Sequence, residues 1–368
     1  MRKAVVVLPT YNEAKNITEM LQKTLNVIAT VQGWSIDVLV VDSKSPDDTA
    51  QKVQALQKKH KNLFLLQTEK EGLGKAYING FTYALQKLNA FVLFEMDSDL
   101  SHNPQDIPLF LKKIEEGADF VVGSRYIPGG SIPKDWAFHR KLFSVLANLI
   151  IRFGFMRLSV TEWTNGFRAI KAWVVKKHLR EMRGYTGYVF QVALLDKAIN
   201  SGARVAEIPV KFTDRVEGVS KINSWEYIYQ TLKYVFLHSS FVKFVIVGLI
   251  GFGVDFGLSF VGIELLKMPI WKATLASTET AIVSNFVLNN FWTFSHKKID
   301  HGLQSYAWNF AKFNLVSSGS IVIQTLGVQF ASHAFGQNLW WLYKILIIAF
   351  IIIPYSYVLY NKIIWKKK

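Results

Sequence analysis

Two aspartates spaced by one residue follow a short apolar run in the first half of the chain. The run spans residues 91–94, and Glu95, Asp97 and Asp99 come directly after it. Carboxylate oxygens are hard ligands that suit Mg²⁺ or Mn²⁺, and ions of this kind usually bind substrate phosphates as well. An Asp-x-Asp pair by itself is more often a solvated turn, so the interpretation depends on the residues that accompany it.

Three other segments place polar side chains directly after apolar runs. Pro9, Tyr11 and Glu13 follow the first run and offer a rigid turn, an aromatic face and a carboxylate, which are groups that a nucleotide base and ribose require. Asp42 ends a second run, and Arg125 follows a third. If these runs are strands of one sheet, all of these side chains meet at one edge.

The first half of the chain alternates short apolar runs with amphipathic stretches, which is typical of an α/β domain. The predicted strands span residues 5–8, 38–41, 63–66, 91–94 and 120–122. The predicted helices span residues 16–29, 48–59, 76–87 and 104–116, the last with Asn103 as its N-cap and Pro104 as its first residue. Continuous apolar strands separated by helices predict a mostly parallel, Rossmann-like sheet covered on both faces. Ligands of such sheets bind at the carboxyl ends of the strands.

Long apolar runs dominate the chain after about residue 235. Four of them come close to the roughly 20 residues that cross a membrane, and they span residues 244–266, 273–294, 313–330 and 345–364. Lysines gather between the second and third runs and at the C-terminus, at positions 297, 298, 312 and 366–368. The positive-inside rule therefore predicts an integral membrane protein with both termini and the α/β domain in the cytoplasm, in agreement with an even number of spans.

These patterns predict three parts: an α/β domain at residues 1–223, a juxtamembrane helix at 224–240 and a four-helix transmembrane domain at 241–368. Two segments, residues 135–155 and 225–237, mix aromatic with basic side chains. Each is expected either to lie flat in the headgroup region of a membrane or to be an ordinary core-facing amphipathic helix. For the second segment, which adjoins the first span, we favour the membrane surface.

The chain is strongly basic and lacks cysteine: 43 Lys and Arg stand against 27 Asp and Glu, a formal net charge of +16. Such a balance suits nucleic acid, an anionic membrane or a phosphorylated substrate. The sequence has neither zinc-finger spacing nor an isolated basic domain, so no nucleic-acid partner is expected. The absence of cysteine excludes disulfides, thiolate metal ligands and a cysteine nucleophile. The first residues lack the apolar core of a signal peptide.

The order and spacing of these segments resemble the inverting family 2 glycosyltransferases of the GT-A fold, and within them the dolichol-phosphate mannose synthases. The resemblance runs from residue 4 to about residue 225 and rests on Pro9-Thr10-Tyr11-Asn12-Glu13, Ser45-Pro46-Asp47, Gly72-Leu73-Gly74, Asp97-Ser98-Asp99-Leu100-Ser101-His102, Gly123-Ser124-Arg125-Tyr126, Gly166-Phe167-Arg168, Arg215 and Ser220-Lys221. Residues 241–364 are similar to the GtrA-like four-helix membrane domain, through residues 244–248 and 285–294.

The resemblance implies roles for particular residues. The nucleoside and the donor diphosphate would be bound by Pro9, Tyr11, Glu13, Asp42, Asp97, Ser98, Asp99, Arg215 and Lys221. A Mg²⁺ or Mn²⁺ ion would be held by Asp97, Asp99 and Ser101, and the acceptor phosphate by Arg125 and Arg140. The catalytic residues would be Asp97, Asp99, Arg125 and Arg140. The sequence departs from the family's usual pattern at Ser43, where a second Asp is common, and at Glu162, which replaces an Asp near the acceptor.

The activity that the resemblance implies is the transfer of mannose from GDP-mannose to dolichyl or another polyprenyl phosphate, with inversion, which makes a lipid-linked sugar donor for glycosylation. A phosphate monoester is largely a dianion at neutral pH, so it can attack without a strong general base. One alternative is transfer of glucose or an aminosugar from a UDP donor to undecaprenyl or polyprenyl phosphate. Another is a non-enzymatic lipid carrier or flippase component.

Asp255 lies in or near the first predicted span, where a charge is costly and often functional. It is expected either to pair inside the bundle with Asn285, Asn289 or Asn290, or to line a polar path for a lipid-linked sugar headgroup.

Overall fold

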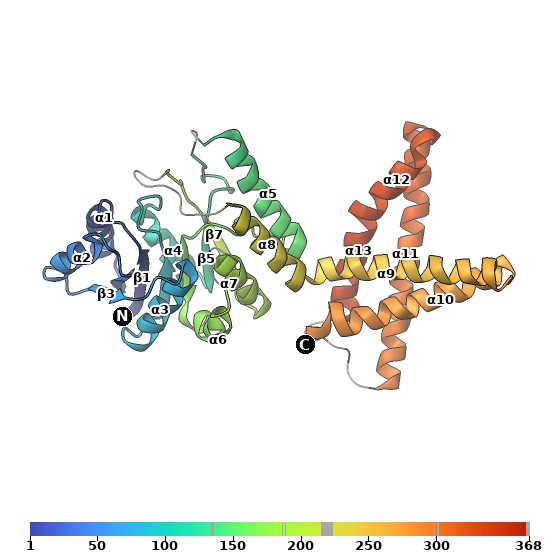
Figure 1. Ribbon diagram of the computed structural model, residues 1–368, viewed down its shortest axis with the longest axis horizontal. Coiled ribbons are helices and arrows are strands. Elements are labelled where there is room, and N and C mark those ends of the chain that lie inside the picture. The colour runs from blue at the N-terminus through green and yellow to red at the C-terminus, as the bar shows by residue number, and fades with distance from the viewer. Residues whose placement is uncertain are drawn as a thin grey trace. The chain divides into compact units, whose positions relative to one another are not determined.

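Seven strands in the described part of the chain form one sheet (Figure 1). They are β1 (Arg2–Thr10), β2 (Trp34–Asp42), β3 (Leu63–Gln67), β4 (Val92–Glu95), β5 (Phe120–Ser124), β6 (Arg168–Lys171) and β7 (Val205–Pro209). Their order across the sheet is β3-β2-β1-β4-β6-β5-β7. Strand β6 runs antiparallel to β4 and β5, and the other neighbouring pairs are parallel. The prediction of a mostly parallel α/β sheet is confirmed.

The computed structural model describes residues 1–133, 136–185, 187, 189–214, 224–297, 299 and 302–365. The chain divides into two compact units, Met1–Val235 and Phe236–Lys368, and each unit is described by itself. The predicted domain boundaries, after residues 223 and 240, stay predictions.

Helices cover both faces of the sheet in the first unit. They include α1 (Ile17–Thr30), α2 (Thr49–Gln57), α3 (Leu73–Gln86), the 3₁₀ turn η1 (Pro104–Asp106), α4 (Ile107–Glu115), α6 (Ala172–Met182) and α7 (Val189–Asn200). Val6 and Leu8 of β1 lie in a buried cluster with Met20 of α1 and Phe110 of α4. Val7, whose side chain points to the opposite face as strand geometry requires, lies against α3. Both faces of β1 are therefore buried, which explains its unbroken apolar sequence.

The predicted strands and helices of the first 122 residues all form, with ends that differ by a few residues. The predicted cap is also confirmed, because the Asn103 side chain accepts a hydrogen bond from the Gln105 backbone N–H and Pro104 is the first residue of η1. The sequence patterns did not single out β6, α6, α7 or β7. Strand β6 has only four residues and carries Arg168 and Lys171 at its ends, so it lacks the apolar run by which the other strands were found.

The two segments with mixed aromatic and basic side chains form α5 (Phe138–Phe155) and α8 (Ser224–His238). Three residues of α5 that recur at helical spacing, Asn148, Ile151 and Phe155, are buried. The rest of α5 presents an exposed apolar face, made by Phe138, Leu142, Phe143, Val145, Leu146, Ile150 and Phe153. Helix α8 repeats this arrangement, with Tyr234 buried and Tyr229, Leu232, Phe236 and Leu237 exposed. Each helix therefore has one apolar face in the protein and a second apolar face outside it.

The second unit is helical. Its elements are α9 (Ser240–Phe260), η2 (Val261–Leu265), α10 (Ile270–Leu288), η3 (Asn289–Thr293), η4 (Ser295–Lys297), α11 (Leu303–Phe335), η5 (Gln337–Leu339), α12 (Trp340–Ile347), η6 (Ile348–Ile352), α13 (Ile353–Leu359) and η7 (Tyr360–Ile364). Among the described residues, three helical segments are long and apolar enough to cross a membrane: Ser240–Leu265, Leu303–Phe335 and Gln337–Ile364. The predicted span at 273–294 is helical, but its many Ser, Thr and Asn side chains make it less apolar, so the predicted count of four spans is not confirmed.

The pairing predicted for Asp255 is wrong in its partners. Its carboxylate accepts hydrogen bonds from the hydroxyls of Ser277 (2.7 Å) and Thr278 (3.0 Å) on α10. Asn285 lies further along the same helix, where a Cβ on Gly251 would come within 2.3 Å of its side-chain amide. Asp255 therefore joins α9 to α10 through hydroxyl donors, and the Gly251–Asn285 contact brings the two helices close together.

The close approach of α3 to the sheet leads to a stability prediction. A Cβ on Gly80 would lie 2.6 Å from Cγ1 of Val7 and 2.8 Å from Cγ2 of Val41, both buried. We therefore expect Gly80→Ala to lower the free energy of unfolding of the first unit by about 1–3 kcal/mol, as overpacking of a core does. Gly184→Ala is the matched control, because the nearest atom to its added Cβ is 3.9 Å away. Denaturant unfolding of the full chain followed by tryptophan fluorescence measures both, and equal stabilities would contradict the prediction.

Candidate active site

The carboxyl ends of β1 and β2 are joined through the side chain of Asp42. Asp42 is fully buried and accepts hydrogen bonds from the Thr10 hydroxyl (3.0 Å) and from the Ser45 backbone N–H (3.0 Å) and hydroxyl (2.6 Å). The Ser45 hydroxyl in turn accepts from the Asn12 backbone N–H. Asp42 thus lies at the predicted edge of the sheet, and its carboxylate holds the loop after β2 against the loop after β1.

The end of β1 and the loop after it carry the other residues predicted to bind a nucleoside. The ammonium group of Lys70 lies 3.8 Å from the centre of the Tyr11 ring, and the Pro9 carbonyl accepts a hydrogen bond from the Ser98 hydroxyl (3.0 Å). Glu13 accepts from the Asn16 side chain. Sequence reasoning missed Lys70, although its place just after β3 at the same edge was a usable signal.

The two aspartates after β4 differ in exposure. Asp99 is buried and accepts hydrogen bonds from the backbone N–H (3.1 Å) and hydroxyl (2.6 Å) of Ser101. The Asp97 side chain keeps 28% of its surface exposed. Among the described residues there is no cluster of three His, Asp or Glu side chains that could hold a metal ion. Two carboxylates still fit Mg²⁺ or Mn²⁺, because such ions complete their shell with water and substrate phosphates. Ser101 lies next to this pair, and its hydroxyl donates a hydrogen bond to Asp99.

His102 fixes the loop that carries the aspartates. The Asp97 backbone N–H donates to His102 Nδ1 (3.0 Å), and Nε2 lies 2.9 Å from the Asn165 side-chain oxygen. Because Nδ1 is the acceptor, the proton of the neutral ring is on Nε2, and it is donated to Asn165. The ring also stacks on Phe167, with 5.0 Å between centroids. His102 is therefore a structural residue of the site.

A buried carboxyl group, that of Glu95, ends β4 two residues before Asp97. Burial raises the pKa of Glu95 to about 7, although the Arg168 guanidinium 3.8 Å away opposes that rise; the charge of Asp97 adds to it. Arg168 is also fully buried and donates to the backbone carbonyls of Asn165, Gln191 and Trp163. Burial and the neighbouring Asp97 carboxylate both favour the uncharged form of Glu95.

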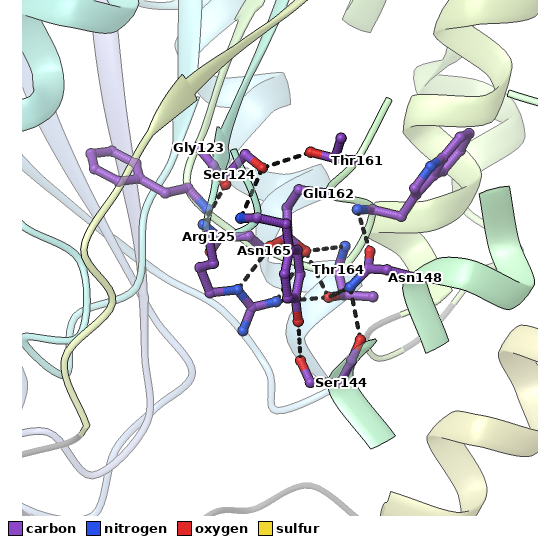
Figure 2. A network of polar contacts seen from close by, with 12 residues as sticks. Gly123, Ser124, Arg125, Ser144, Asn148, Thr161, Glu162, Thr164 and Asn165 are labelled. Carbon is purple, nitrogen blue, oxygen red and sulfur yellow. Dashed lines mark hydrogen bonds and ion pairs between the residues drawn. The ribbon is translucent and has the colours of Figure 1, made fainter. Parts of the chain in front are cut away.

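Arg125, directly after β5, forms a buried two-pronged ion pair with Glu162 (Figure 2). Nε donates to one carboxylate oxygen (2.8 Å), and Nη2 donates to the other (3.0 Å) and to the Thr164 hydroxyl (2.9 Å). Only 7% of the Arg125 side chain and none of the Glu162 side chain is exposed. The pair fixes the position and the plane of the guanidinium group.

The Glu162 loop is held from several sides. Glu207 of β7 accepts hydrogen bonds from the backbone N–H groups of Thr161 and Glu162. Asn148 of α5 accepts from the Trp163 backbone N–H (2.7 Å), which ties α5 to the same loop. Burial pushes the pKa of Glu162 upward, but the charge of Arg125 and the hydrogen bonds to the carboxylate outweigh it, so the pKa lies below its usual value. Glu162 is therefore an ionised counter-charge at neutral pH.

Arg140 of α5 occupies a different environment from Arg125. Its guanidinium lies 3.9 Å from the centre of a Trp136 ring and 3.3 Å from the Asp214 carboxylate, and 47% of the side chain is exposed. Phe212 packs edge-on against the Trp136 ring, with 5.8 Å between centroids, and its ring centre lies 5.5 Å from the Arg125 guanidinium. Arg140 is thus accessible to solvent, whereas Arg125 is buried and held by Glu162. The predicted donor-phosphate residues Arg215 and Lys221 lie outside the described residues.

Comparison with known families and proteins assigns both parts of the chain. Residues 5–182 match the model of glycosyl transferase family 2, and residues 243–365 match that of the GtrA/DPMS transmembrane domain. The chain is 33% identical over 329 residues to the dolichol-phosphate mannosyltransferase of Pyrococcus furiosus, a match that covers 87% of this chain and 88% of that relative. The chain belongs to glycosyltransferase family 2. It is a glycosyltransferase with a family 2 catalytic unit and a GtrA/DPMS transmembrane domain.

Two further relatives match a smaller share of this glycosyltransferase. The polyprenol monophosphomannose synthase of Mycolicibacterium smegmatis is 36% identical, over 60% of this chain and 82% of the relative. The undecaprenyl-phosphate mannosyltransferase of Micrococcus luteus is 34% identical, over 60% and 88%. Among solved structures, glucosyl-3-phosphoglycerate synthase of Mycobacterium tuberculosis with Mn²⁺ and UDP is 18% identical, covers 64% of this chain and 79% of that chain, and has a TM-score of 0.46. No assignment rests on that structural likeness.

The buried ion pair makes the stability of this glycosyltransferase pH-dependent. Glu162→Gln leaves Arg125 without its counter-charge, so we expect it to cost about 3 kcal/mol of unfolding free energy at neutral pH. Since the folded-state pKa of Glu162 is lowered, its contribution is present above the usual value of 4.5 and is lost as the pH falls through the lowered value. The difference between wild type and variant should therefore shrink below pH 4.5.

The measurement is denaturant unfolding of both proteins across that pH range. Glu181→Gln is the control, because Glu181 also pairs with a base, Lys197, but on the surface. Its loss should cost no more than about 1 kcal/mol. A Glu162→Gln protein as stable as the control at neutral pH would contradict the prediction.

Proposed function

We propose that this glycosyltransferase transfers mannose from GDP-mannose to the phosphate of a dolichyl or other polyprenyl lipid, with inversion at the anomeric carbon. One observation carries the proposal: a relative named dolichol-phosphate mannosyltransferase is similar to this chain across both units. The two further relatives are named polyprenol monophosphomannose synthase and undecaprenyl-phosphate mannosyltransferase, so both names join mannose to a polyprenyl phosphate. Membership of an enzyme family favours this reading over a non-enzymatic lipid carrier.

The proposed reaction needs no strong general base from the protein, but it needs positive charge to stabilise the anionic substrates and leaving group. The acceptor phosphate is already a nucleophile near neutral pH. The donor and the acceptor are both anions, however, and the nucleoside diphosphate leaves with negative charge. A Mg²⁺ or Mn²⁺ ion held by Asp97 and Asp99 would supply Lewis-acid stabilisation of that leaving group. The chain itself must then neutralise and orient the acceptor.

The environments of the two arginines support different parts in holding the acceptor phosphate. The Arg140–Asp214 pair is half exposed, and pairs of this kind contribute about 0–1 kcal/mol, so a phosphate can replace Asp214 at little cost. The Arg125–Glu162 pair is buried, and separating it costs several kcal/mol. We infer that Arg140 exchanges its carboxylate partner for the acceptor phosphate, while Arg125 meets the phosphate with Glu162 still bound.

The exposed apolar faces of α5 and α8 fit an acceptor that is anchored in a bilayer. Phe138 and Phe153, at opposite ends of α5, are 79% and 54% exposed, which is costly for large apolar side chains in water. Because Arg140 lies on the same helix, α5 in the headgroup layer would present a cation at the depth of a lipid phosphate. We propose that both helices lie at the membrane surface.

The test of the reaction is transfer of labelled sugar to dolichyl and undecaprenyl phosphate from GDP-mannose, UDP-glucose and UDP-N-acetylglucosamine, each with Mn²⁺, Mg²⁺ or EDTA. We expect a metal-dependent mannolipid from GDP-mannose alone, with inverted anomeric configuration by NMR. Asp97→Asn and Asp99→Asn should each lower the rate at least about 100-fold, a loss of the size seen when one charge-stabilising group is removed.

The control for these variants is Glu181→Gln, which removes an exposed acid on α6 and should transfer at the wild-type rate. A UDP-sugar product would replace the donor assignment, and a product with retained configuration would exclude single displacement. Wild-type activity in a folded Asp99→Asn protein would overturn the metal assignment.

We also propose that the catalytic unit and the C-terminus lie in the cytoplasm, which requires α10 to cross the membrane together with the three apolar segments. The chain has no cysteine, so single introduced cysteines report topology directly. In inside-out vesicles, an impermeant maleimide should label Arg183→Cys and a cysteine appended after Lys368, but not Lys267→Cys or Gln337→Cys in the helix connections. Labelling of Arg183→Cys and the appended cysteine from opposite sides would mean that α10 does not cross.

A further inference from the structure

The side chain of Asn165 lies where the loop after β4, the end of β5 and the loop before β6 meet. It is 3% exposed. Its oxygen accepts hydrogen bonds from His102 Nε2 (2.9 Å) and from the Phe167 backbone N–H (3.3 Å). Its amide nitrogen donates to the Gly123 carbonyl (2.6 Å), at the end of β5. Figure 2 shows Asn165 close to Gly123 and Glu162, with which it forms hydrogen bonds.

The backbone of Asn165 is engaged as well. Its N–H donates to the Glu162 carboxylate (3.1 Å), and its carbonyl accepts from Arg168 Nε (2.8 Å). The residue therefore fixes its own loop through main-chain bonds and reaches the loop after β4 and the end of β5 through its side chain.

These contacts form a continuous connection between the two halves of the proposed reaction. On the donor side, the Asp97 backbone N–H is held by His102, and His102 is held by Asn165. On the acceptor side, Asn165 binds the carboxylate that orients Arg125, and it binds the carbonyl of Gly123, two residues before Arg125. The Asn165 side chain therefore links the loop of Asp97 and His102 to strand β5 through two hydrogen bonds.

We propose that Asn165 is a positioning residue that holds the Asp97–Ser101 loop in register with Arg125, and so sets the separation between donor and acceptor. The inference rests on the proposed function, which assigns the two sides. An amide is suited to this place because it is both an acceptor for His102 and a donor to a carbonyl. The requirement is strict, because misplacement of reacting groups by about 1 Å can cost about 100-fold in rate.

A double-mutant cycle on the full-length protein tests the connection. His102→Phe keeps the stacking on Phe167 but removes both ring hydrogen bonds, and Asn165→Leu keeps the volume but removes the amide. For each single variant and the double variant, kcat and both KM values are measured, and Mn²⁺ binding is measured by EPR in the presence of GDP without acceptor. We expect each single variant to lower kcat about 10- to 100-fold. Asn165→Leu should also weaken Mn²⁺ binding.

The expected signature of a shared connection is non-additivity: the double variant should be no worse than the poorer single variant, because both break the same link. His102→Gln, which retains an acceptor and a donor, should recover part of the rate. Asn148→Leu is the matched control, since Asn148 is also 3% exposed but holds the loop from α5. Its effect should multiply with that of His102→Phe and should leave Mn²⁺ binding unchanged.

Multiplicative effects of His102→Phe and Asn165→Leu, or unchanged Mn²⁺ binding in Asn165→Leu, would overturn the inference. If Asn165→Leu does not fold, Asn165→Ser replaces it, because a serine is too short to reach both His102 and the Gly123 carbonyl. Failure of the proposed function looks different, since the wild-type protein itself would then bind no Mn²⁺ with GDP or transfer no mannose.

Discussion

The buried ion pair between Arg125 and Glu162 constrains the whole edge of the sheet at which the site lies. An arginine and a glutamate withdrawn from water stay ionised only if both are well bonded, and here the backbone around Glu162 is arranged to satisfy that demand. Glu207 holds the loop from β7, and Asn148 holds it from α5. The geometry around Arg125, on the proposed acceptor side, therefore follows from the need to keep one charge pair intact.

The proposed donor side is organised by smaller interactions, in which carboxylates again bind the backbone and hydroxyls of nearby loops. Asp42 and Asp99 both accept hydrogen bonds from backbone N–H groups of their own loops. His102 accepts a hydrogen bond from the Asp97 backbone N–H. The carboxylate that remains more accessible is Asp97, which is the one expected to face a metal and a diphosphate. Preorganisation of this type places charge where it is needed before the substrate arrives, so that little rearrangement is required during reaction.

Much of this arrangement could be predicted from the sequence, because parallel strands bring their carboxyl ends to one edge. That rule was enough to place Asp42, Asp97 and Arg125 together. It could not predict what each side chain does there. The partner of Arg125 is 37 residues away in the chain and that of His102 is 63 away, and no local pattern encodes such contacts. The count of membrane spans was uncertain for a different reason, since α10 buries polar side chains against α9 and so departs from uniform apolarity.

Strand β6 runs against its neighbours, and this has a topological consequence. In a sheet of parallel strands, only the loops that leave the strands lie at the ligand edge, and the loops that enter lie at the far edge. Because β6 is antiparallel to β4 and β5, it begins where they end, with Arg168 paired to Glu95 and Val122. The loop that leads into β6, with Glu162 and Asn165, is thereby delivered to the ligand edge. Because this one strand is reversed, the loop that leads into it lines the site. A purely parallel sheet would have placed that loop at the opposite edge.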